Sequence, residues 1–448
     1  MSVPLARPLT LFERALYGDG SLPGNTTVTA CIEGRLDEAT VRHALSGLQA
    51  KHPLLRCLVE ERDGRPWFVV QASPPPLGFC IAGRRGDDDW LDASARDLLQ
   101  RFDGRREPLA RLTWLRGETR SEFILACHHA IGDGRSLLTL LGELLALCGE
   151  PRRGIGRHDA LPAFADLVPA AVRDDARLAR SLRWRAAALR LALRLFARPR
   201  PAPVYGEIYR EWWKLEEADA QRLAEQCRLQ SVSAYAALAL ALALAFHAVC
   251  GPRRIARFNA PVDMRRFLPG IADDQLFAVA PTVALRPGAA RAGEPDAAAF
   301  WSQARAMQSD MHRAIDRLAP RVYRNFLGME LLHGVFDRMA AWGRSHRAGR
   351  QVTLSHLGRL SLPQDYRGFR LRDVRGISGV IGATPAHLVV TSRYAGAFDF
   401  VLASDTVSLP RAQALAIRDR TLDTLAAVAA PQTRAGASVV STLPAGAS

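Results

Sequence analysis

The sequence predicts a mixed α/β (α+β) fold of two lobes, each a mixed sheet flanked by helices. The chain has 448 residues, which is enough for two domains of ordinary size, and 48% are hydrophobic, so each lobe can bury a full core. Strand-like and helix-like segments alternate along both halves. Prolines at 199, 201 and 203 separate the halves.

We assign residues 1–172 to the N-terminal lobe. Asp37 lies near the start of the first predicted helix, and we expect His52 to be a helix-end residue that satisfies helix carbonyl groups rather than a catalytic residue. The predicted elements are strands at 25–34, 52–59, 67–70, 111–115 and 122–127, and helices at 37–51 and 90–102.

A seven-residue string, His-His-Ala-Ile-Gly-Asp-Gly, occupies residues 128–134 between an apolar strand and a helical pattern. Neighbouring strand residues point to opposite faces, so only one of His128 and His129 can face a given cavity. A neutral imidazole there can take a proton from a hydroxyl or an amine. Gly134 is expected to let the backbone turn sharply and approach a ligand. A buried histidine pair without chemistry is the alternative.

This HHxxxDG string in its strand–turn–helix setting resembles the condensation-domain acyltransferase superfamily, and most the polyketide-associated acyltransferases of the phthiocerol dimycocerosyl transferase type. The segment His52-Pro53-Leu54-Leu55-Arg56 is also similar to this family. The resemblance implies two chloramphenicol-acetyltransferase-like lobes with an active-site channel between them. It implies that His129 is the general base, that Asp133 pairs with an arginine, and that His128 and Gly134 support the base and its loop.

Residues 173–204 predict a basic amphipathic helix followed by a Pro-rich linker. Arginines at 173, 177, 180, 183, 190, 194 and 198 fall mainly on one helical face, and Leu178, Leu182, Leu189, Leu193 and Phe196 fall on the opposite one. Three interpretations remain open. The helix can lie between the lobes with a solvated arginine face, contact a membrane surface, or dock an acidic protein.

The C-terminal lobe is assigned to residues 205–430, and 431–448 to a frayed tail. The uncharged stretch 229–252 is rich in alanine and falls short of a membrane span, so we expect a buried helix. By the resemblance, Arg265 is the partner of Asp133. The predicted elements are strands at 208–215, 254–262, 379–381, 387–393 and 398–403, and helices from 216, from 231 and over 410–427.

A second recognisable segment lies at residues 351–363. Related polyketide-associated acyltransferases carry a Ser-Asn-x-Gly-like string near the channel, and this chain has Ser355-His356-Leu357-Gly358. The resemblance makes Ser355 and Gly358 candidates for substrate binding. Ser355 can donate to the developing oxyanion or can be a strand-end hydroxyl bonded to backbone. The Asp-Phe-Gly-Trp-Gly segment of the plant subfamily is missing.

Composition narrows the function classes. Seven scattered cysteines form no CxxC pair, so we expect a reducing cytoplasm, no disulfide framework and no metal site. Cys127, next to the histidine pair, is expected to pack in the core rather than act as a nucleophile. The net charge is +15, and nearly all of the basic residues are arginines. No nucleic-acid-binding module is recognisable in the sequence. The charge favours acidic partners unless it reflects base composition alone.

The sequence therefore predicts an acyltransferase without a bound cofactor. No carrier or adenylation segment is recognised, so we expect a standalone enzyme in polyketide, lipid or other secondary-metabolite biosynthesis. The resemblance implies a co-substrate, either acyl-phosphopantetheine on an acyl or peptidyl carrier protein or acyl-coenzyme A, and a small-molecule or lipid acceptor with a hydroxyl or amine. The alternatives are a wax-ester or glycolipid acyltransferase at a membrane surface, and a catalytically silent member that binds a carrier protein or an acyl chain.

Overall fold

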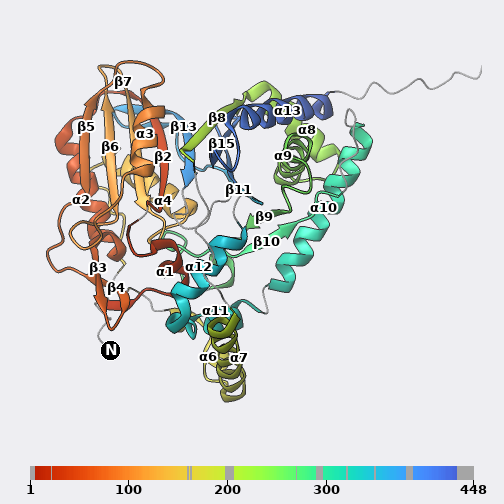
Figure 1. Cartoon of the computed structure of the whole chain (residues 1–448). Helices are drawn as coiled ribbons and strands as arrows, with labels where there is room; N and C mark the ends of the chain where they lie inside the picture. Colours follow the sequence, from red (N-terminus) through yellow and green to blue (C-terminus); the bar gives the residue numbers. More distant parts are fainter. Residues whose placement is uncertain are drawn as a thin grey trace, which may run out of the picture.

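The computed structural model describes residues 6–430, apart from residues 22, 159–160, 162–163, 197–205, 269, 289–295, 319–320, 348–349 and 380–386. Two six-stranded sheets, each flanked by helices, form two lobes that lie side by side (Figure 1). The predicted fold class is confirmed. The predicted tail at 431–448 and most of the Pro-rich linker lie outside the described residues.

The first sheet combines strands from both halves of the chain. Its order is β12-β13-β2-β7-β6-β5, and β13 runs antiparallel to β2. The strands are β2 (Asn25–Gly34), β5 (Gly78–Gly83), β6 (Ala110–Arg116), β7 (Arg120–His128), β12 (Asp365–Tyr366) and β13 (Phe369–Gly379). Residues 365–379 therefore complete the sheet that carries the histidine pair. Of the strand predicted at 379–381, only Gly379 is described, as the last residue of β13.

The two faces of this sheet are covered by different helices. Helices α2 (Glu38–Lys51) and α4 (Gly134–Gly149) pack together on the face that carries Val28 and Leu125. Helix α3 (Asp89–Leu99) covers the other face, where Trp90 packs against Ile124. As predicted, Asp37 caps α2 by accepting from the backbone N–H of Thr40 at 2.8 Å.

A small sheet of order β1-β4-β3 lies beside this lobe, formed by β1 (Ala6–Pro8), β3 (Cys57–Arg62) and β4 (Arg65–Val70), with α1 (Leu11–Tyr17) following β1. The strand predicted at 52–59 was wrong in its first half. Pro53–Arg56 form a 3-10 turn, because proline has no N–H for a strand ladder and Leu55 donates back to His52. The strand begins only at Cys57.

The second sheet has the order β10-β9-β11-β14-β15-β8. Its strands are β8 (Ile208–Leu215), β9 (Arg257–Pro261), β10 (Thr282–Leu285), β11 (Gln351–Arg359), β14 (His387–Tyr394) and β15 (Ala397–Asp405), and its helices are α8 (Glu217–Leu229), α9 (Ala234–Cys250), α10 (Ala297–Leu318) and α13 (Arg411–Ala429). The uncharged stretch forms α9, and ten of its residues are buried in the core, as predicted.

Within the described residues, no single helix has both the length and the hydropathy of a membrane span. Helices α8 and α9 meet these criteria only when taken together, and they are bent by 108° with respect to each other.

A third group of helices lies at one edge of the molecule. It contains α5 (Phe164–Leu167), α6 (Ala170–Arg173), α7 (Ala176–Phe196), α11 (Val322–Glu330) and α12 (Phe336–Arg347), with short 3-10 turns at Met264–Phe267 and His333–Val335. The helix predicted from residue 173 is divided, because α6 ends at Arg173 and α7 begins at Ala176. Helix α7 packs on α11 and α12.

Candidate active site

The histidine motif occupies the junction between β7 and α4. Strand β7 ends at His128, and α4 begins at Gly134 with Asp133 as its N-cap. The Asp133 carboxylate accepts the backbone N–H of Ser136 at 2.8 Å. This cap satisfies one of the helix N–H groups that lack an internal partner, so the turn between strand and helix is held firmly.

His129 is the partly exposed member of the histidine pair. Its backbone N–H donates to the carbonyl of Gly24 at 2.6 Å, which anchors the turn to the start of β2. Its Nδ1 is buried without a hydrogen-bond partner, which leaves Nε2 as the nitrogen that faces solvent. Burial lowers the pKa of His129, although the Asp133 carboxylate and nearby carbonyl groups oppose the shift. The ring is therefore neutral at physiological pH and can accept a proton.

His128 lies inside the N-terminal lobe. It is 3% exposed and contacts the rings of Tyr17 and Phe102, with centroid distances of 5.3 and 6.5 Å. Its Nδ1 accepts the N–H of Ala130 at 3.1 Å. Burial, and then the neighbouring His129, lower the pKa of His128 to about 3. The two histidines thus occupy different environments, and His128 packs in the interior.

Asp133 is engaged by Arg265, the partner expected from the resemblance. Arg265 Nη1 donates to Asp133 Oδ2 at 2.8 Å, and Nη2 donates to Oδ1 at 3.3 Å. The two side chains are 2% and 11% exposed. Burial opposes the charge on Arg265, but the Asp133 carboxylate outweighs it and raises the pKa of Arg265. Arg265 therefore stays charged, and the pair links the motif to the segment that follows β9.

Ser136 completes this network, and the sequence analysis missed it. Its hydroxyl is fully buried, accepts from Arg265 Nη2 at 2.8 Å and from the N–H of Phe277 at 3.0 Å, and lies 2.9 Å from Asp133 Oδ1. Phe277 also accepts the backbone N–H of Asp133 at 3.0 Å. The spacing Asp-x-x-Ser is a recognisable helix-start signal, but the partner loop around Phe277 lies 141 residues away.

Gly134 plays a different part from the one predicted. It is not among the glycines with positive φ, so the turn does not need its conformational freedom. A Cβ at this position would lie 2.9 Å from Cδ2 of Leu357, which belongs to β11 in the other lobe. A larger residue would make the Leu357 side chain shift, because the second lobe packs directly on the first turn of α4. Gly134 therefore sets how closely the lobes approach beside His129.

The Ser355–Gly358 segment forms the end of β11. The pairing of β11 with β14 shifts register between His356 and Arg359, and Gly358 has a φ of +70°. His356 Nδ1 lies 2.7 Å from the Thr391 hydroxyl, and its ring stacks on Tyr235 at 5.5 Å. Burial lowers the pKa of His356 to about 4. The carbonyl of Ser355 accepts from Thr391 at 3.4 Å.

A cleft of about 630 Å³ opens between α4 and the end of β11. Its wall contains His356 rather than Ser355, so the structure brings the histidine of this string to the cleft. The lining residues are Arg135, Leu138, Thr139, Gly142, Glu143, Asp263, His356, Leu357, Arg359, Leu360, Ser361 and Leu362. The apolar part of the cleft begins at Leu357, directly above Gly134. Leu357 thus lies both in the wall of the cleft and against Gly134, whereas His129 is not among the lining residues.

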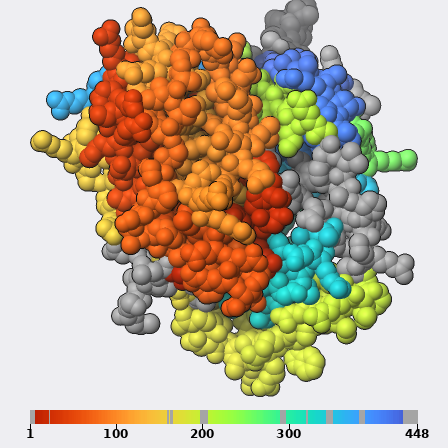
Figure 2. All heavy atoms as spheres, turned by 60° about the vertical axis from the view of Figure 1, so that its left-hand side comes forward, coloured from red at the N-terminus to blue at the C-terminus, as the bar shows by residue number. Residues whose placement is uncertain are grey.

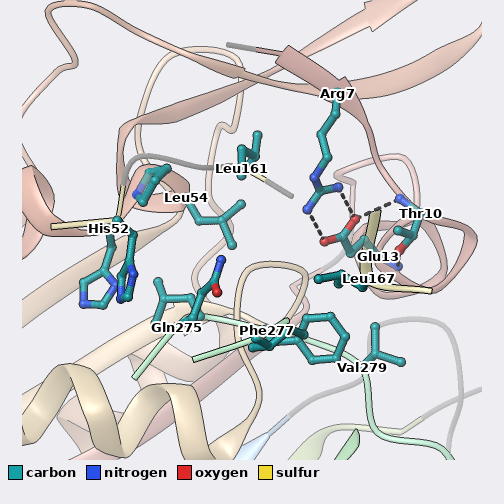
Figure 3. A pocket seen from close by; sticks show the side chains of 14 residues that line it. Arg7, Thr10, Glu13, His52, Leu54, Leu161, Leu167, Gln275, Phe277 and Val279 are labelled. Atoms are coloured by element: carbon teal, nitrogen blue, oxygen red, sulfur yellow. Dashed lines mark hydrogen bonds and ion pairs between the residues drawn. The ribbon is translucent and has the colours of Figure 1, made fainter. Parts of the chain in front are cut away.

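A second, internal cavity of about 30 Å³ lies on the other side of the Phe277 loop (Figure 3). Arg7 and Glu13 form a bidentate buried pair beside it, at 2.7 and 2.8 Å. His52 is also in its wall, and its Nε2 lies 2.7 Å from Glu143. As predicted, His52 ends α2 and satisfies a helix carbonyl, because its backbone N–H donates to Leu48 at 3.0 Å, while its side chain lies against Glu143. This cavity is too small for a substrate.

Cys127 packs in the core of the N-terminal lobe, 1% exposed, with its sulfur 3.2 Å from the Thr26 hydroxyl. Burial raises its pKa to about 12, so the thiol stays protonated at neutral pH. Cys–His nucleophilic chemistry is therefore not supported by this geometry. Among the residues that the structure describes, no group of three or more His, Cys, Asp or Glu side chains could hold a metal ion.

Comparison with protein families gives a match to the condensation domain over residues 19–266, more than half of the chain. The cyclosporin synthetase of Tolypocladium inflatum is 32% identical over 142 residues, which are 31% of this chain but 1% of that protein. The AMB antimetabolite synthetase AmbE of Pseudomonas aeruginosa is 30% identical over 199 residues, 40% of this chain and 9% of its own length. The chain thus spans a small fraction of these relatives.

Solved structures extend the similarity to nearly the whole chain. Polyketide synthase associated protein 5 from Mycobacterium tuberculosis aligns over 95% of this chain and 98% of its own, with a TM-score of 0.61 and 19% identity. The trichothecene 15-O-acetyltransferase of Fusarium sporotrichioides aligns over 94% and 95%, with a TM-score of 0.69 and 12% identity. At these identities the likeness shows a shared fold.

Proposed function

The chain belongs to the condensation-domain family, and we propose that it transfers an acyl group from a thioester to a hydroxyl or amine acceptor. One observation carries this proposal. His129 is the partly exposed, neutral imidazole of the motif, while the only carboxylate of the motif, Asp133, is committed to Arg265 and Ser136. This arrangement provides a base at the end of β7 and a rigid support behind it.

In the proposed reaction, Nε2 of His129 takes the proton from the acceptor as the acceptor oxygen or nitrogen attacks the thioester carbonyl carbon. The carbonyl oxygen becomes an oxyanion, for which we propose donors near Gly134, with Ser355 as a second candidate. The C–S bond then breaks, and the proton on His129 passes to the leaving thiolate. The products are an ester or an amide and a free thiol, so no redox partner is needed.

The cleft between α4 and β11 is proposed to admit the thioester. Its volume falls within the range of small-molecule sites, and its wall combines leucines with polar groups at the rim. Arg135 pairs with Asp263 and Asp273, whereas Arg359 is exposed and has no ion pair among the described residues. A guanidinium at this mouth suits the phosphate of a phosphopantetheine arm or of coenzyme A. His356 and Leu357 would then border the acyl end.

We further propose that the donor is a carrier-protein thioester rather than acyl-coenzyme A. Carrier proteins are usually acidic, and the net charge of +15 would steer such a partner toward the enzyme. Salt screens this attraction over about 10 Å at 0.1 M. The same acyl group is therefore compared on both donors by kcat/KM across a salt series. A carrier advantage that shrinks with salt supports docking, whereas equal reactivity and equal salt response remove the carrier from the proposal.

The catalytically silent alternative is tested at the same time. An acyl thioester of N-acetylcysteamine, offered with a panel of alcohols and amines, should release thiol and yield an acylated product that mass spectrometry detects. Binding of the thioester without any acceptor-dependent thiol release would favour a silent acyl-binding protein and remove the transferase proposal.

A further inference from the structure

We propose that the outward face of α7 docks on the surface of an anionic lipid bilayer. Helix α7 lies at the edge of the molecule, below the two lobes and beside α11 and α12 (Figure 1). The space-filling view shows the same segment as the lowest layer of the molecule, with its outer side uncovered (Figure 2). A flat surface could therefore reach the whole length of this helix without contacting the lobes first.

The inward face of α7 is already occupied. Leu182 and Ala186 are buried, and Leu193 packs in the cluster formed with Leu332 and Phe336. Arg190 donates to the carbonyl of Leu331 on the same side. The apolar face predicted from the sequence is thus, for the most part, the face that holds α7 on the protein. Leu182 and Leu193 of this face are therefore not available to a partner, whereas Leu189 and Phe196 remain exposed.

The outward face carries a second apolar row. Trp184, Leu191 and Leu195 are 74%, 57% and 63% exposed, and their spacing of seven and four residues places them on one line along the helix. Eight large apolar side chains are well exposed among the described residues, and five of them belong to α7. Scattered exposed leucines need no explanation, but such a concentration on one helix marks an interaction surface.

Arginines flank this row. Helix α7 contains six arginines and no acidic residue. Five of them are exposed and have no ion pair among the described residues: Arg177, Arg180, Arg183, Arg185 and Arg194. Their positive charge is therefore free to meet anions from outside. Long arginine side chains can place the guanidinium at the level of lipid phosphates while their stems lie along the apolar row.

A bilayer fits this face better than an acidic protein does. The row lies on the surface of one helix, and no residue of α7 lines either of the two cavities described above. Tryptophan and leucine along the middle of a helix, with arginines at the margins, are typical of helices that lie in the membrane interface. The bilayer supplies both a planar apolar layer for the row and phosphates for the arginines.

Vesicle sedimentation of the full chain tests the proposal. The protein is mixed with vesicles of phosphatidylcholine alone or with added phosphatidylglycerol. The row variant, Trp184→Ser, Leu191→Ser and Leu195→Ser together, keeps every arginine, so adsorption by charge alone is unchanged. The control variant replaces the well-exposed apolar residues outside α7, by Leu99→Ser, Leu229→Ser and Val407→Ser together. We expect the row variant to lose affinity for anionic vesicles at least about tenfold and the control to stay within about twofold.

Fluorescence gives a second readout on the folded protein. Trp184 is the only tryptophan among the well-exposed apolar residues that are described, so a blue shift of the emission on anionic vesicles should vanish in Trp184→Phe. His129→Ala should bind vesicles as the wild type does, which separates this proposal from the catalytic one. Equal vesicle binding by the row and control variants would mean that net charge alone causes the binding, and this result would overturn the proposal. Absence of vesicle binding, with slower transfer from an acidic carrier in the row variant, would assign the face to a protein instead.

Discussion

Replacing Arg265 with alanine should destabilise the protein more than any other single change in the motif network. The substitution removes the donors to Asp133 at 2.8 Å and to Ser136 at 2.8 Å, and also the donor to the carbonyl of Gln275 at 3.2 Å. Because the Asp133 side chain is only 11% exposed, its carboxylate would remain largely buried with Ser136 as its one side-chain partner. Breaking a buried pair in this way costs about 3–5 kcal/mol of unfolding free energy.

Asp133→Asn should cost less, about 1–3 kcal/mol, because asparagine keeps one acceptor oxygen and Arg265 retains its contact with Asp263 at 3.3 Å. The double variant should then lose less than the sum of the two single losses, since the second change removes a group that has already lost its partner. Arg135→Ala is the matched control. Its pairs with Asp263 and Asp273 are about half exposed, so it should cost below about 1 kcal/mol.

Urea and thermal unfolding of the four variants supply the test, with thiol release from an acyl thioester as a parallel readout. Arg265→Ala should lower both stability and rate, because the segment after β9 holds the turn that carries His129. Strictly additive losses in the double variant, or an Arg265→Ala protein that melts like Arg135→Ala, would show that this pair does not support the motif.

Three further predictions concern the same region. His356 has a pKa of about 4 in the folded protein, so between pH 6.5 and 4 its side chain takes up a proton only in the unfolded chain. The unfolding free energy should therefore fall by about 1.4 kcal/mol for each unit that the pH falls in this range. In urea titrations at several pH values, His356→Asn should show a weaker dependence on pH. Gly134→Ala should lower the unfolding free energy by about 1 kcal/mol, measured by thermal unfolding, and should slow acyl transfer. Adding Leu357→Ala should restore both the stability and the rate, because it removes the side chain that the new Cβ would contact. A double variant as impaired as Gly134→Ala would contradict this explanation. Because burial lowers the pKa of His129, the acid limb of kcat/KM should have its midpoint below 6.5, the ordinary pKa of histidine.

The strands and helices that build the two lobes followed well from local patterns. Residues 25–34 alternate strand-forming side chains on both faces, and β2 has these same bounds in the structure. The Ala/Leu stretch was predicted as a buried helix because it lacks charge, and α9 is buried. The turn at Pro53 was missed because apolar strand-like residues outweighed a proline that removes a ladder donor.

Long-range arrangements were less predictable. Nothing local at residues 365–379 shows that β12 and β13 leave the second lobe and pair with β2. Ser136 was missed for a similar reason, because its importance depends on Phe277, which reaches it from another segment. Gly134 was singled out for its backbone freedom, but its φ is not positive and its close neighbour Leu357 belongs to the other lobe. The family motif pointed to the candidate site, whereas the contacts that support the motif come from distant segments that no local pattern predicts.

The measurement that tests the account most directly is acyl transfer by His129→Ala beside His128→Ala. Both proteins should remain folded, and His129→Ala should lose about 10²- to 10⁴-fold in acceptor-dependent thiol release, because it lacks the partly exposed neutral base. His128→Ala should keep more of the rate and lose more in melting temperature, because it opens a cavity beside Tyr17 and Phe102. A His129→Ala protein as active as the wild type would contradict the assignment of His129 as the base.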